Sequence, residues 1–405
     1  MRVLLSTYGS RGDVQPMVAL GVELRARGVE ARLSAPGEQE FADMSARAAL
    51  PFRPAFLPVR RWITDKAKPA PADFPRIAAE MMGGQLTAIE AAAEGCDAIV
   101  ATGLMPSAAA AQCVAEMRGI PYLHASFCPL FLPSHHHRPF PYPGQPLPAD
   151  VTDNRVLWDL NVRTMNTLFG EAINTHRVSL GLEPSDNVRD LIFTRRPLLA
   201  SEESLWPWQS TDLCSAVQTG AWTLPDHRLL PAELAAFLVA GEPPIYVGFG
   251  SIAVPSAEES ARAALEAIRA QDRRAVVLRG WAELDSGDDR DDRLTVGEVN
   301  QQALFRRVAA VLHHGGAGTT TAAARAGAPQ VIVPQIVDQP FWAGRVAGLG
   351  IGIAHDGAAG SVESLSVALE AALVPAVRGR ALALAKTIRT DGAGVAADLV
   401  IEAIG

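Results

Sequence analysis

The chain of 405 residues is 48% hydrophobic and 20% charged, a composition typical of globular proteins with sizeable cores, and its length favours two domains over one. A formal net charge of −8 disfavours non-specific binding to nucleic acid or anionic lipid. The four cysteines form no CxxC pair, which disfavours a zinc knuckle or a disulfide framework and predicts a reducing, cytoplasmic setting. No signal peptide is predicted, because the opening segment turns polar early, and no apolar run reaches the ~20 residues of a membrane span.

The N-terminal part of the chain alternates between strand and helix patterns. Residues 2–7 are apolar and β-prone, residues 8–15 (YGSRGDVQ) are predicted as a loop, and residues 16–28 have helical apolar spacing. Pro16 suits the first turn of that helix, and Gly28 suits its C-terminal cap. A second strand pattern follows, and the same rhythm continues toward the middle of the chain. This alternation predicts a parallel sheet with crossover helices.

The middle of the chain has a different character. Residues 128–150 are rich in proline and aromatic residues and are predicted as a long irregular loop. We interpret the aromatic side chains of this region as an adaptable apolar wall for a bulky ligand. These side chains are Phe127, Phe131, Phe140 and Tyr142. The run His135–His137 could bind a metal, but it lacks carboxylate or thiolate companions, which disfavours a metal site. Residues 154–182 then have the pattern of one or two helices.

Strand and helix patterns alternate again in the second half of the chain, which predicts a second parallel sheet. We therefore predict an α/β fold of two Rossmann-like domains whose sheets face each other across a cleft. Ligands of such sheets bind outside the carboxyl ends of the strands. The predicted boundaries are a first domain at 1–216, a linker at 217–228, a second domain at 229–385 and a C-terminal helix at 386–405 that packs back on the first domain.

The segment AAVLHHGGAGTTTAAARAGAPQ, at 309–330, has the pattern of a strand that runs through small residues into a helix. A helix N-terminus presents backbone N–H groups and a partial positive charge, and both favour phosphate. The glycines would let a phosphate approach the backbone, and either His313 or His314 could donate a ring N–H. The alternative is a tight turn with satisfied histidines. The segment lacks the GxxxxGK[ST] motif, which disfavours ATP hydrolysis, and no GxGxxG follows the first strand.

A longer stretch carries a family resemblance. HHGGAGTTTAAARAGAPQVIVPQIVDQPFWAGRVAGLGIG resembles the donor-binding motif of GT-B nucleotide-sugar glycosyltransferases, particularly the vancomycin-group enzymes that tailor antibiotics in actinomycetes. The resemblance covers essentially the whole chain and includes MRVLLSTYGSRGDVQPMVALGVELR, VGEVNQQALFRRVAAVLHHGGAGTT and IRTDGAGVAADLV. Residues 127–150 are the part without a close match. The resemblance implies a GT-B fold with an acceptor-binding first domain and a nucleotide-sugar-binding second domain.

The resemblance also implies where the sugar donor binds. The nucleobase would lie against Val299, near Arg279 and Trp281. The diphosphate-binding residues that the resemblance implies are Ser251, His313, Gly315, Gly316, Ala317, Gly318 and Thr319, and Arg11 is a further candidate. The pair Asp338–Gln339 would hold the sugar hydroxyls, although the residues by themselves allow a simple turn there equally well.

Transfer of a sugar to a hydroxyl needs a base, and the resemblance assigns this role to Asp13. Taken by itself, Asp13 is better interpreted as a helix cap. Its neighbour Ser10 could hydrogen-bond the acceptor, and Arg11 could reach the phosphates or pair with a surface carboxylate. The family inverts the anomeric centre, which fits a single displacement with one base. The other candidates for the base are His124 and His135–His137.

The expected function is that of an inverting, metal-independent and cofactor-free glycosyltransferase. It would move a hexose or deoxyhexose from a TDP- or UDP-sugar to a hydroxyl of a natural-product aglycone, with glycopeptide antibiotics as candidate acceptors, and it would be a monomer. A sterol or lipid glycosyltransferase is one alternative; a basic membrane-binding patch would favour it, and the sequence shows none. A nucleotide-sugar epimerase of GT-B fold is a second alternative. It would need no acceptor, so the long apolar loop disfavours it. A non-catalytic sugar-nucleotide-binding protein is disfavoured by the intact Asp13 and Asp338–Gln339.

Overall fold

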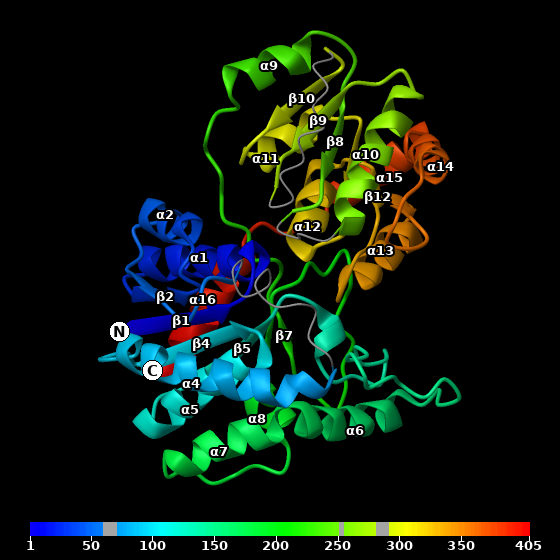
Figure 1. The fold of residues 1–405 in the computed structure, drawn as a ribbon. Coiled ribbons are helices and arrows are strands. Elements are labelled where there is room, and N and C mark those ends of the chain that lie inside the picture. The colour runs from blue at the N-terminus through cyan, green and yellow to red at the C-terminus, as the bar shows by residue number, and fades with distance from the viewer. Residues whose placement is uncertain (60–70, 251–254, 281–290) are drawn as a thin grey trace. The chain divides into compact units, whose positions relative to one another are not determined.

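A computed structural model describes most of the chain (Figure 1). The described residues are 1–59, 71–250, 255–280 and 291–405. Two of the expected donor-binding residues, Ser251 and Trp281, lie outside them.

The chain folds into two compact units. The residues of unit 1 are Met1–Ser201, Trp208–Leu224 and Arg389–Gly405, and those of unit 2 are Glu202–Pro207 and Pro225–Ile388. The division differs from the sequence-based boundaries, because unit 1 includes 217–224 of the predicted linker, unit 2 runs from 225 to 388, and the short segment Glu202–Pro207 also belongs to unit 2. The final helix belongs to the first unit.

In its described residues, unit 1 is built on a seven-stranded sheet in the order β3-β2-β1-β4-β5-β6-β7, and every pairing is parallel. The strands are β1 (Arg2–Tyr8), β2 (Glu30–Ala35), β3 (Phe52–Pro54), β4 (Ala98–Gly103), β5 (Tyr122–Ser126), β6 (Leu198–Leu199) and β7 (Val217–Gln218). The central strand β1 buries Val3, Leu4 and Leu5 in succession, as expected for a parallel strand that is covered on both faces.

Helices surround this sheet (Figure 1). Those described are α1 (Arg11–Ala26), α2 (Gln39–Arg47), α4 (Phe74–Ala92), α5 (Met105–Arg118), α6 (Asn154–Met165), α7 (Glu171–Ser179), α8 (Val188–Phe193) and α16 (Gly392–Ile404). A π-helical turn at Asn166–Gly170 joins α6 to α7, so the expected one or two helices at 154–182 form one nearly continuous rod. Helices α4 and α5 pack on the sheet face that carries Leu4 and Ile99. Helix α16 packs against α1.

Helix α1 begins five residues before the position predicted from Pro16. Ser10 is its N-cap, and Asp13 closes a capping box by accepting the Ser10 backbone N–H at 2.8 Å. The predicted loop at 8–15 is therefore largely helix, and Pro16 lies inside it. Pro16 indicates a first helical turn in the sequence, and for this reason the predicted start is wrong. The helix tolerates the loss of one N–H donor at its sixth position. Gly28, with φ 78°, follows the C-cap, as predicted.

Unit 2 carries a second parallel sheet, of six strands in its described residues, in the order β10-β9-β8-β11-β12-β13. The strands are β8 (Ile245–Gly248), β9 (Ala275–Leu278), β10 (Arg293–Val296), β11 (Ala310–His313), β12 (Gln330–Ile332) and β13 (Gly352–Ala354). The helices described are α9 (Ala232–Val239), α10 (Pro255–Arg269), α11 (Gln301–Leu304), α12 (Ala317–Ala326), α13 (Gln339–Gly348), α14 (Val362–Ala372) and α15 (Pro375–Ala385).

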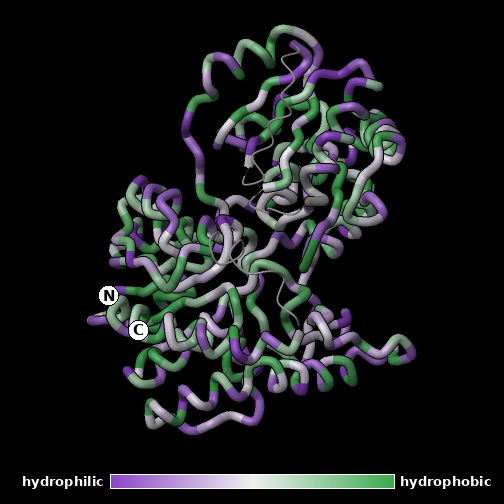
Figure 2. Tube along the Cα trace, in the orientation of Figure 1, coloured by the Kyte–Doolittle hydropathy of each residue, from purple (hydrophilic) through white to green (hydrophobic). Residues whose placement is uncertain are grey.

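The side chains of this sheet alternate between two hydrophobic cores. Val247 and Leu312 point into one core, beneath α10 and α14, while Tyr246 and Val311 point into the other. Figure 2 shows hydrophobic residues along the strands of each unit and polar residues on many of the surrounding loops. The predicted α/β architecture of two parallel-sheet units is confirmed. Among the described residues, no helix combines the length and apolarity needed to cross a membrane.

Candidate functional site

The turn between β11 and α12 is built from glycines that the local packing requires. Gly315 has φ 93°, and a Cβ atom there would lie 2.6 Å from Ile332 Cγ2. Gly316 is the N-cap of α12, and a Cβ atom there would lie 2.6 Å from the His314 ring. Side chains at these two positions would therefore displace their neighbours, so the backbone stays bare at the start of the helix.

The first turn of α12 offers N–H groups to an anion. Ala317, Gly318 and Thr319 occupy the first three helical positions, which have no acceptor within a helix, and Gly318 is exposed. The buried Thr320 does not add a hydroxyl donor, because its hydroxyl donates to Gly316 O at 3.0 Å. The three N–H groups and the partial positive charge of the helix end together form a site of the kind that binds phosphate.

His313 does not lie where a phosphate could reach it. Its side chain is 0% exposed, its Nδ1 accepts the Gly315 backbone N–H at 3.1 Å, and its Nε2 lies 2.9 Å from Gln330 Oε1. Because Nδ1 is an acceptor, the proton of the neutral ring belongs on Nε2, which donates to Gln330. Burial lowers the pKa of His313 to about 3. In this structure the ring shapes the glycine turn and is not available for the direct phosphate contact that the sequence suggested.

The adjacent His314 is the histidine that borders the helix N-terminus. Positions for a Cβ atom at Gly250 and Gly316 both fall within 2.7 Å of its ring atoms, so the ring lies between two glycines. Burial lowers the pKa of His314 to about 4, so the ring is neutral at pH 7. The sequence by itself allows either histidine to donate to a phosphate, and the resemblance implies His313. The alternation of side chains along β11 could have shown that only one of the two can face away from the core.

The predicted sugar-binding pair lies beside this turn. A Cβ atom at Gly315 would lie 3.2 Å from Gln339 O and 3.4 Å from Gln339 Cβ, so the start of α13 adjoins the start of α12. Asp338 precedes α13, and its Oδ2 accepts the indole N–H of Trp342 at 2.9 Å. Burial raises the pKa of the Asp338 carboxyl.

Gln339 itself is used to shape the loop before α13. Its Oε1 accepts the backbone N–H groups of Gln335 at 2.7 Å and Ile336 at 3.1 Å, and the residue is buried. Within this loop, Val337 has φ 56°, an unusual conformation for a β-branched residue. The simple turn that the sequence allows at Asp338–Gln339 is therefore present. The structure leaves Asp338 as the more exposed member of the pair.

The two described residues expected at the nucleobase follow neighbouring strands. Arg279 comes directly after β9 and is exposed, and its backbone N–H donates to Val296 O at 2.9 Å. Val299 follows β10, and its side chain is part of a hydrophobic core. The buried side chain leaves the backbone groups of Val299 as the part that a base would contact. Asn300 supports this position, since its amide donates to Asp226 O and Arg228 O.

The predicted catalytic residues lie together in the first turn of α1, within unit 1. Ser10 caps the helix and accepts the Gly12 N–H at 3.3 Å, while Asp13 holds the Ser10 N–H. Gly9 makes room for this arrangement, because a Cβ atom there would lie 2.1 Å from Asp13 Oδ2. Arg11 donates to Gln15 Oε1 at 3.2 Å. The carboxylate is thus held by the helix end and is only partly buried.

The aromatic residues expected at the acceptor form two groups. The rings of Phe131, Phe140 and Tyr142 follow one another in edge-to-face contacts, with centroids 5.9 Å and 5.2 Å apart. Phe127 instead contacts Trp222, with centroids 5.8 Å apart. All four side chains are half-buried in unit 1. Burial raises the pKa of the Tyr142 hydroxyl, which therefore stays protonated.

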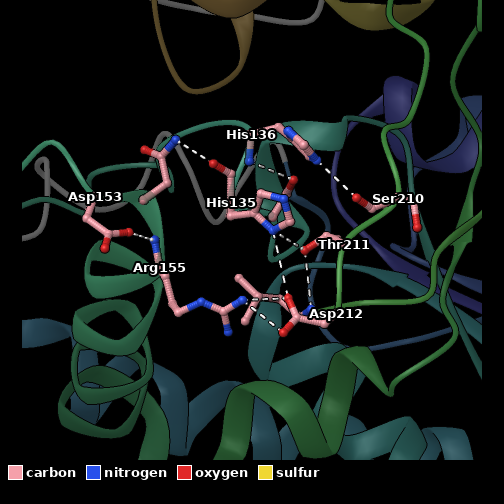
Figure 3. A network of polar contacts seen from close by, with 10 residues as sticks. His135, His136, Asp153, Arg155, Ser210, Thr211 and Asp212 are labelled. Atoms are coloured by element: carbon pink, nitrogen blue, oxygen red, sulfur yellow. Dashed lines mark hydrogen bonds and ion pairs between the residues drawn. The ribbon is translucent and has the colours of Figure 1, made fainter.

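Two of the three histidines of the central loop, His135 and His136, contact residues 210 and 211 (Figure 3). The His135 ring lies 3.0 Å from Thr211 Oγ1, and the His136 ring lies 3.0 Å from Ser210 O. The neighbouring Asp212 accepts two hydrogen bonds from Arg155, at 2.7 and 2.8 Å. These contacts fasten the loop to residues 210–212. In the part of the chain that the structure describes, no group of three His, Cys, Asp or Glu side chains could hold a metal ion.

Comparison with known families agrees with this geometry. Residues 3–135 match the glycosyltransferase family 28 N-terminal domain, and residues 288–394 match the erythromycin biosynthesis protein CIII-like C-terminal domain. Two parallel-sheet units, with a glycine-rich helix N-terminus in the second, are the architecture of GT-B glycosyltransferases. The protein is an enzyme of this class.

Curated relatives specify the family. The chain is 52% identical to glycosyltransferase GtfE and 49% identical to vancomycin aglycone glucosyltransferase, both of Amycolatopsis orientalis. Each match covers 100% of this chain and 98% of the relative. The dTDP-epi-vancosaminyltransferase of the same organism is 43% identical over 100% of this chain and 98% of its own length. The chain therefore belongs to the vancomycin-group family of antibiotic-tailoring glycosyltransferases.

Solved structures share the fold. The glycotransferase of kitacinnamycin superposes with a TM-score of 0.74 at 21% identity, covering 99% of this chain and 98% of that chain. Glycosyltransferase VinC, solved in complex with DTDP, gives a TM-score of 0.69 at 18% identity over 100% of this chain and 99% of that chain. At these identities the likeness concerns the fold alone.

Proposed function

We propose that this glycosyltransferase transfers a hexose or deoxyhexose, with inversion, from a TDP- or UDP-sugar to a hydroxyl of a natural-product aglycone in antibiotic biosynthesis. The observation that carries the donor part is the junction of two helix starts, where the N–H groups of α12 adjoin the loop that carries Asp338. The N-terminus of α12 suits a diphosphate, and the loop before α13 offers the Asp338 carboxylate to sugar hydroxyls. The names of the relatives, which include an aglycone glucosyltransferase and a dTDP-sugar transferase, support both the donor and the acceptor class.

In the proposed reaction the acceptor oxygen attacks the anomeric carbon as the bond from that carbon to the diphosphate oxygen breaks. The acceptor proton passes to the Asp13 carboxylate, and the diphosphate leaves with the electron pair of the broken bond. The backbone N–H groups at the start of α12 stabilise the negative charge that grows on the diphosphate. His314, neutral and next to Gly316, is the ring we place at the phosphates in place of His313.

Product analysis tests this function. We expect a glycosylated aglycone, detected by mass spectrometry, when the enzyme meets a matrix of TDP- and UDP-sugars and glycopeptide aglycones, and NMR of the product should show the inverted anomeric configuration. A sterol or lipid as the only glycosylated acceptor would contradict the proposed acceptor class. Conversion of the free nucleotide sugar without an acceptor would instead indicate an epimerase.

We also propose that catalysis requires no divalent metal or other cofactor, since the α12 N-terminus can supply the positive field for the leaving group. The enzyme should keep its activity after exhaustive chelation. Activity that disappears and returns with magnesium or manganese would refute this part of the proposal. We expect the active species to be a monomer, which sedimentation of the working enzyme would check.

A further inference from the structure

A short segment from the middle of the chain packs on α13, the helix of unit 2 that follows the proposed sugar-binding residue Asp338. Glu202–Pro207 belongs to unit 2, although the residues before and after it belong to unit 1. Its Trp206 ring packs edge-to-face against Phe341, with centroids 5.1 Å apart, and the Arg345 guanidinium lies 4.7 Å from the Trp206 centroid. Both partners are on α13, one turn apart.

Polar contacts also hold the two residues that precede this ring. Arg345 Nε donates to Leu205 O at 3.0 Å, so one guanidinium binds the backbone and faces the indole at once. Ser204 donates to Thr387 O at 3.1 Å and accepts the Thr387 hydroxyl at 2.9 Å. Leu205 is fully buried. The partial burial of Arg345 strengthens its attraction to the indole ring, because less water screens the cation.

A continuous series of contacts leads from Trp206 to the proposed sugar-binding carboxylate. Phe341, which touches Trp206, also packs edge-to-face on Trp342, with centroids 5.1 Å apart. Trp342 is buried, and its indole N–H donates to Asp338 Oδ2 at 2.9 Å. The orientation of the Asp338 carboxylate is therefore set by Trp342, whose ring is supported by the aromatic pair above it.

We propose that Trp206 is a positioning residue for the donor sugar, acting through Phe341 and Trp342 on Asp338. This inference rests on the proposed role of Asp338 in binding the sugar. Removal of the indole would leave a gap beside Phe341 and free Arg345 to move, so the first turns of α13 would lose their support. The N–H groups proposed for the diphosphate belong to α12, a different element, and should keep their positions.

The test compares the affinity for TDP-glucose with the affinity for TDP, measured by calorimetry; UDP-glucose and UDP replace them if the parent binds the uridine pair more tightly. Trp206→Leu should weaken TDP-glucose binding about tenfold and change TDP binding less than about twofold. Trp206→Phe keeps a ring and should restore most of the sugar-dependent affinity. Trp208→Leu is a matched control, because Trp208 belongs to unit 1 and packs near Leu132 and Leu199.

The outcomes separate this inference from the proposed function. If Asp338→Asn weakens TDP-glucose binding but a folded Trp206→Leu binds both ligands like the parent, the positioning role is refuted and the sugar site stands. If Asp338→Asn has no effect, the proposed sugar site itself fails. Equal weakening of both ligands by Trp206→Leu would indicate general damage and also refute the role. Should Trp206→Leu not fold, Arg345→Met removes the guanidinium contacts alone and is expected to weaken TDP-glucose binding selectively, by about threefold.

Discussion

At the scale of single residues, the capping box of α1 shows how the Asp13 carboxylate can support the helix start and also serve the proposed role of base. The sequence allowed Asp13 to be either a cap or a base. In the structure Ser10 is the cap, and Asp13 closes the box by accepting the Ser10 N–H. A carboxylate held in this way has a defined orientation at the carboxyl end of β1, which is where ligands of parallel sheets bind.

Asp13→Asn should abolish most turnover and leave the fold intact. The asparagine Oδ1 can still accept the Ser10 N–H, so the substitution removes a proton acceptor with little loss of capping. We expect kcat to fall about 10²–10⁴-fold, the usual contribution of a general base. Nucleotide affinity and the melting temperature should barely change. A variant with a normal melt and kcat within about threefold of the parent would remove Asp13 from the mechanism.

The histidines offer less attractive bases in that event. His124 is buried and stacks on Phe193, with centroids 4.8 Å apart, and burial lowers its pKa to about 3. The rings of His135 and His136 are held by Thr211 and Ser210. No sequence pattern shows these contacts, because they join positions about 75 residues apart along the chain.

Gln330 is a site residue that sequence reasoning missed, although a glutamine buried in a short strand is itself a signal of a polar network. Its Oε1 receives the His313 Nε2–H, and its amide donates to Thr320 O at 3.3 Å. Gln330→Leu should cost roughly 1–3 kcal/mol of folding free energy, because it leaves a buried donor unpaired. Without these hydrogen bonds the glycine turn between β11 and α12 should be less rigid, which should also weaken nucleoside diphosphate binding.

Gln330→Glu provides the comparison. An ionised carboxylate at this fully buried position would turn an acceptor oxygen toward Thr320 O, which is also an acceptor, so a loss at least as large as that of Gln330→Leu is expected. Chemical denaturation gives the free energies, and ¹⁵N NMR of the imidazole should report the Nε2–H tautomer in the parent. An Nδ1–H tautomer in the parent enzyme would contradict the hydrogen-bond pattern that we derive.

At the scale of elements, strand and helix patterns predict the two sheets well because parallel strands are short, apolar and separated by helices. The beginning of α1 was predicted poorly. A proline at the sixth helical position was mistaken for a start signal, although Ser10 and Asp13 already had the spacing of a capping box. The transition from β11 to α12 was predicted correctly, because its glycines mark the end of the strand and the start of the helix.

Gly316→Val should damage donor binding more than folding. Gly316 has φ −62°, which valine can adopt, but its Cβ atom would lie 2.6 Å from His314 Nε2 and push the ring out of place. We expect nucleoside diphosphate affinity to fall at least about tenfold, corresponding to ~1.4 kcal/mol, with a small change in melting temperature. Gly344→Val on α13 is the control, since a Cβ atom at Gly344 meets nothing within 4 Å. Unchanged affinity in a folded Gly316→Val enzyme would show that this glycine does not border the phosphates.

At the scale of the whole molecule, the path of the chain is what sequence patterns could least predict. The segment Glu202–Pro207 looks like any connector in the sequence, and the contacts of Ser204, Leu205 and Trp206 join it to unit 2. Such contacts depend on residues more than a hundred positions apart and leave no periodic signal. The resemblance supplied the order of the two domains and the donor motif, while the support of the site by His313, Gln330 and Trp206 required coordinates.

The last helix is expected to stabilise the unit that contains the first residues of the chain. Helix α16 packs on α1 and buries Ala393, Ala396, Ala397 and Val400. Its exposed ion pair, Asp398 with Arg27 at 2.6 Å, should add little. Deletion of residues 389–405 should therefore destabilise unit 1 by several kcal/mol, on the order of the apolar burial that is lost.

The same deletion should leave the proposed nucleotide binding by unit 2 intact, because Arg389–Gly405 belongs to unit 1. Calorimetric melting with and without TDP separates the two effects, since the ligand should raise only the transition of unit 2. Gly392→Ala is a milder companion variant, because a Cβ atom there would lie 2.6 Å from Gly220 O and press on the backbone of unit 1. Gly392→Ala should lower the melting temperature of unit 1 less than the deletion does. A truncated chain that melts like the parent would show that α16 does not contribute to the stability of unit 1.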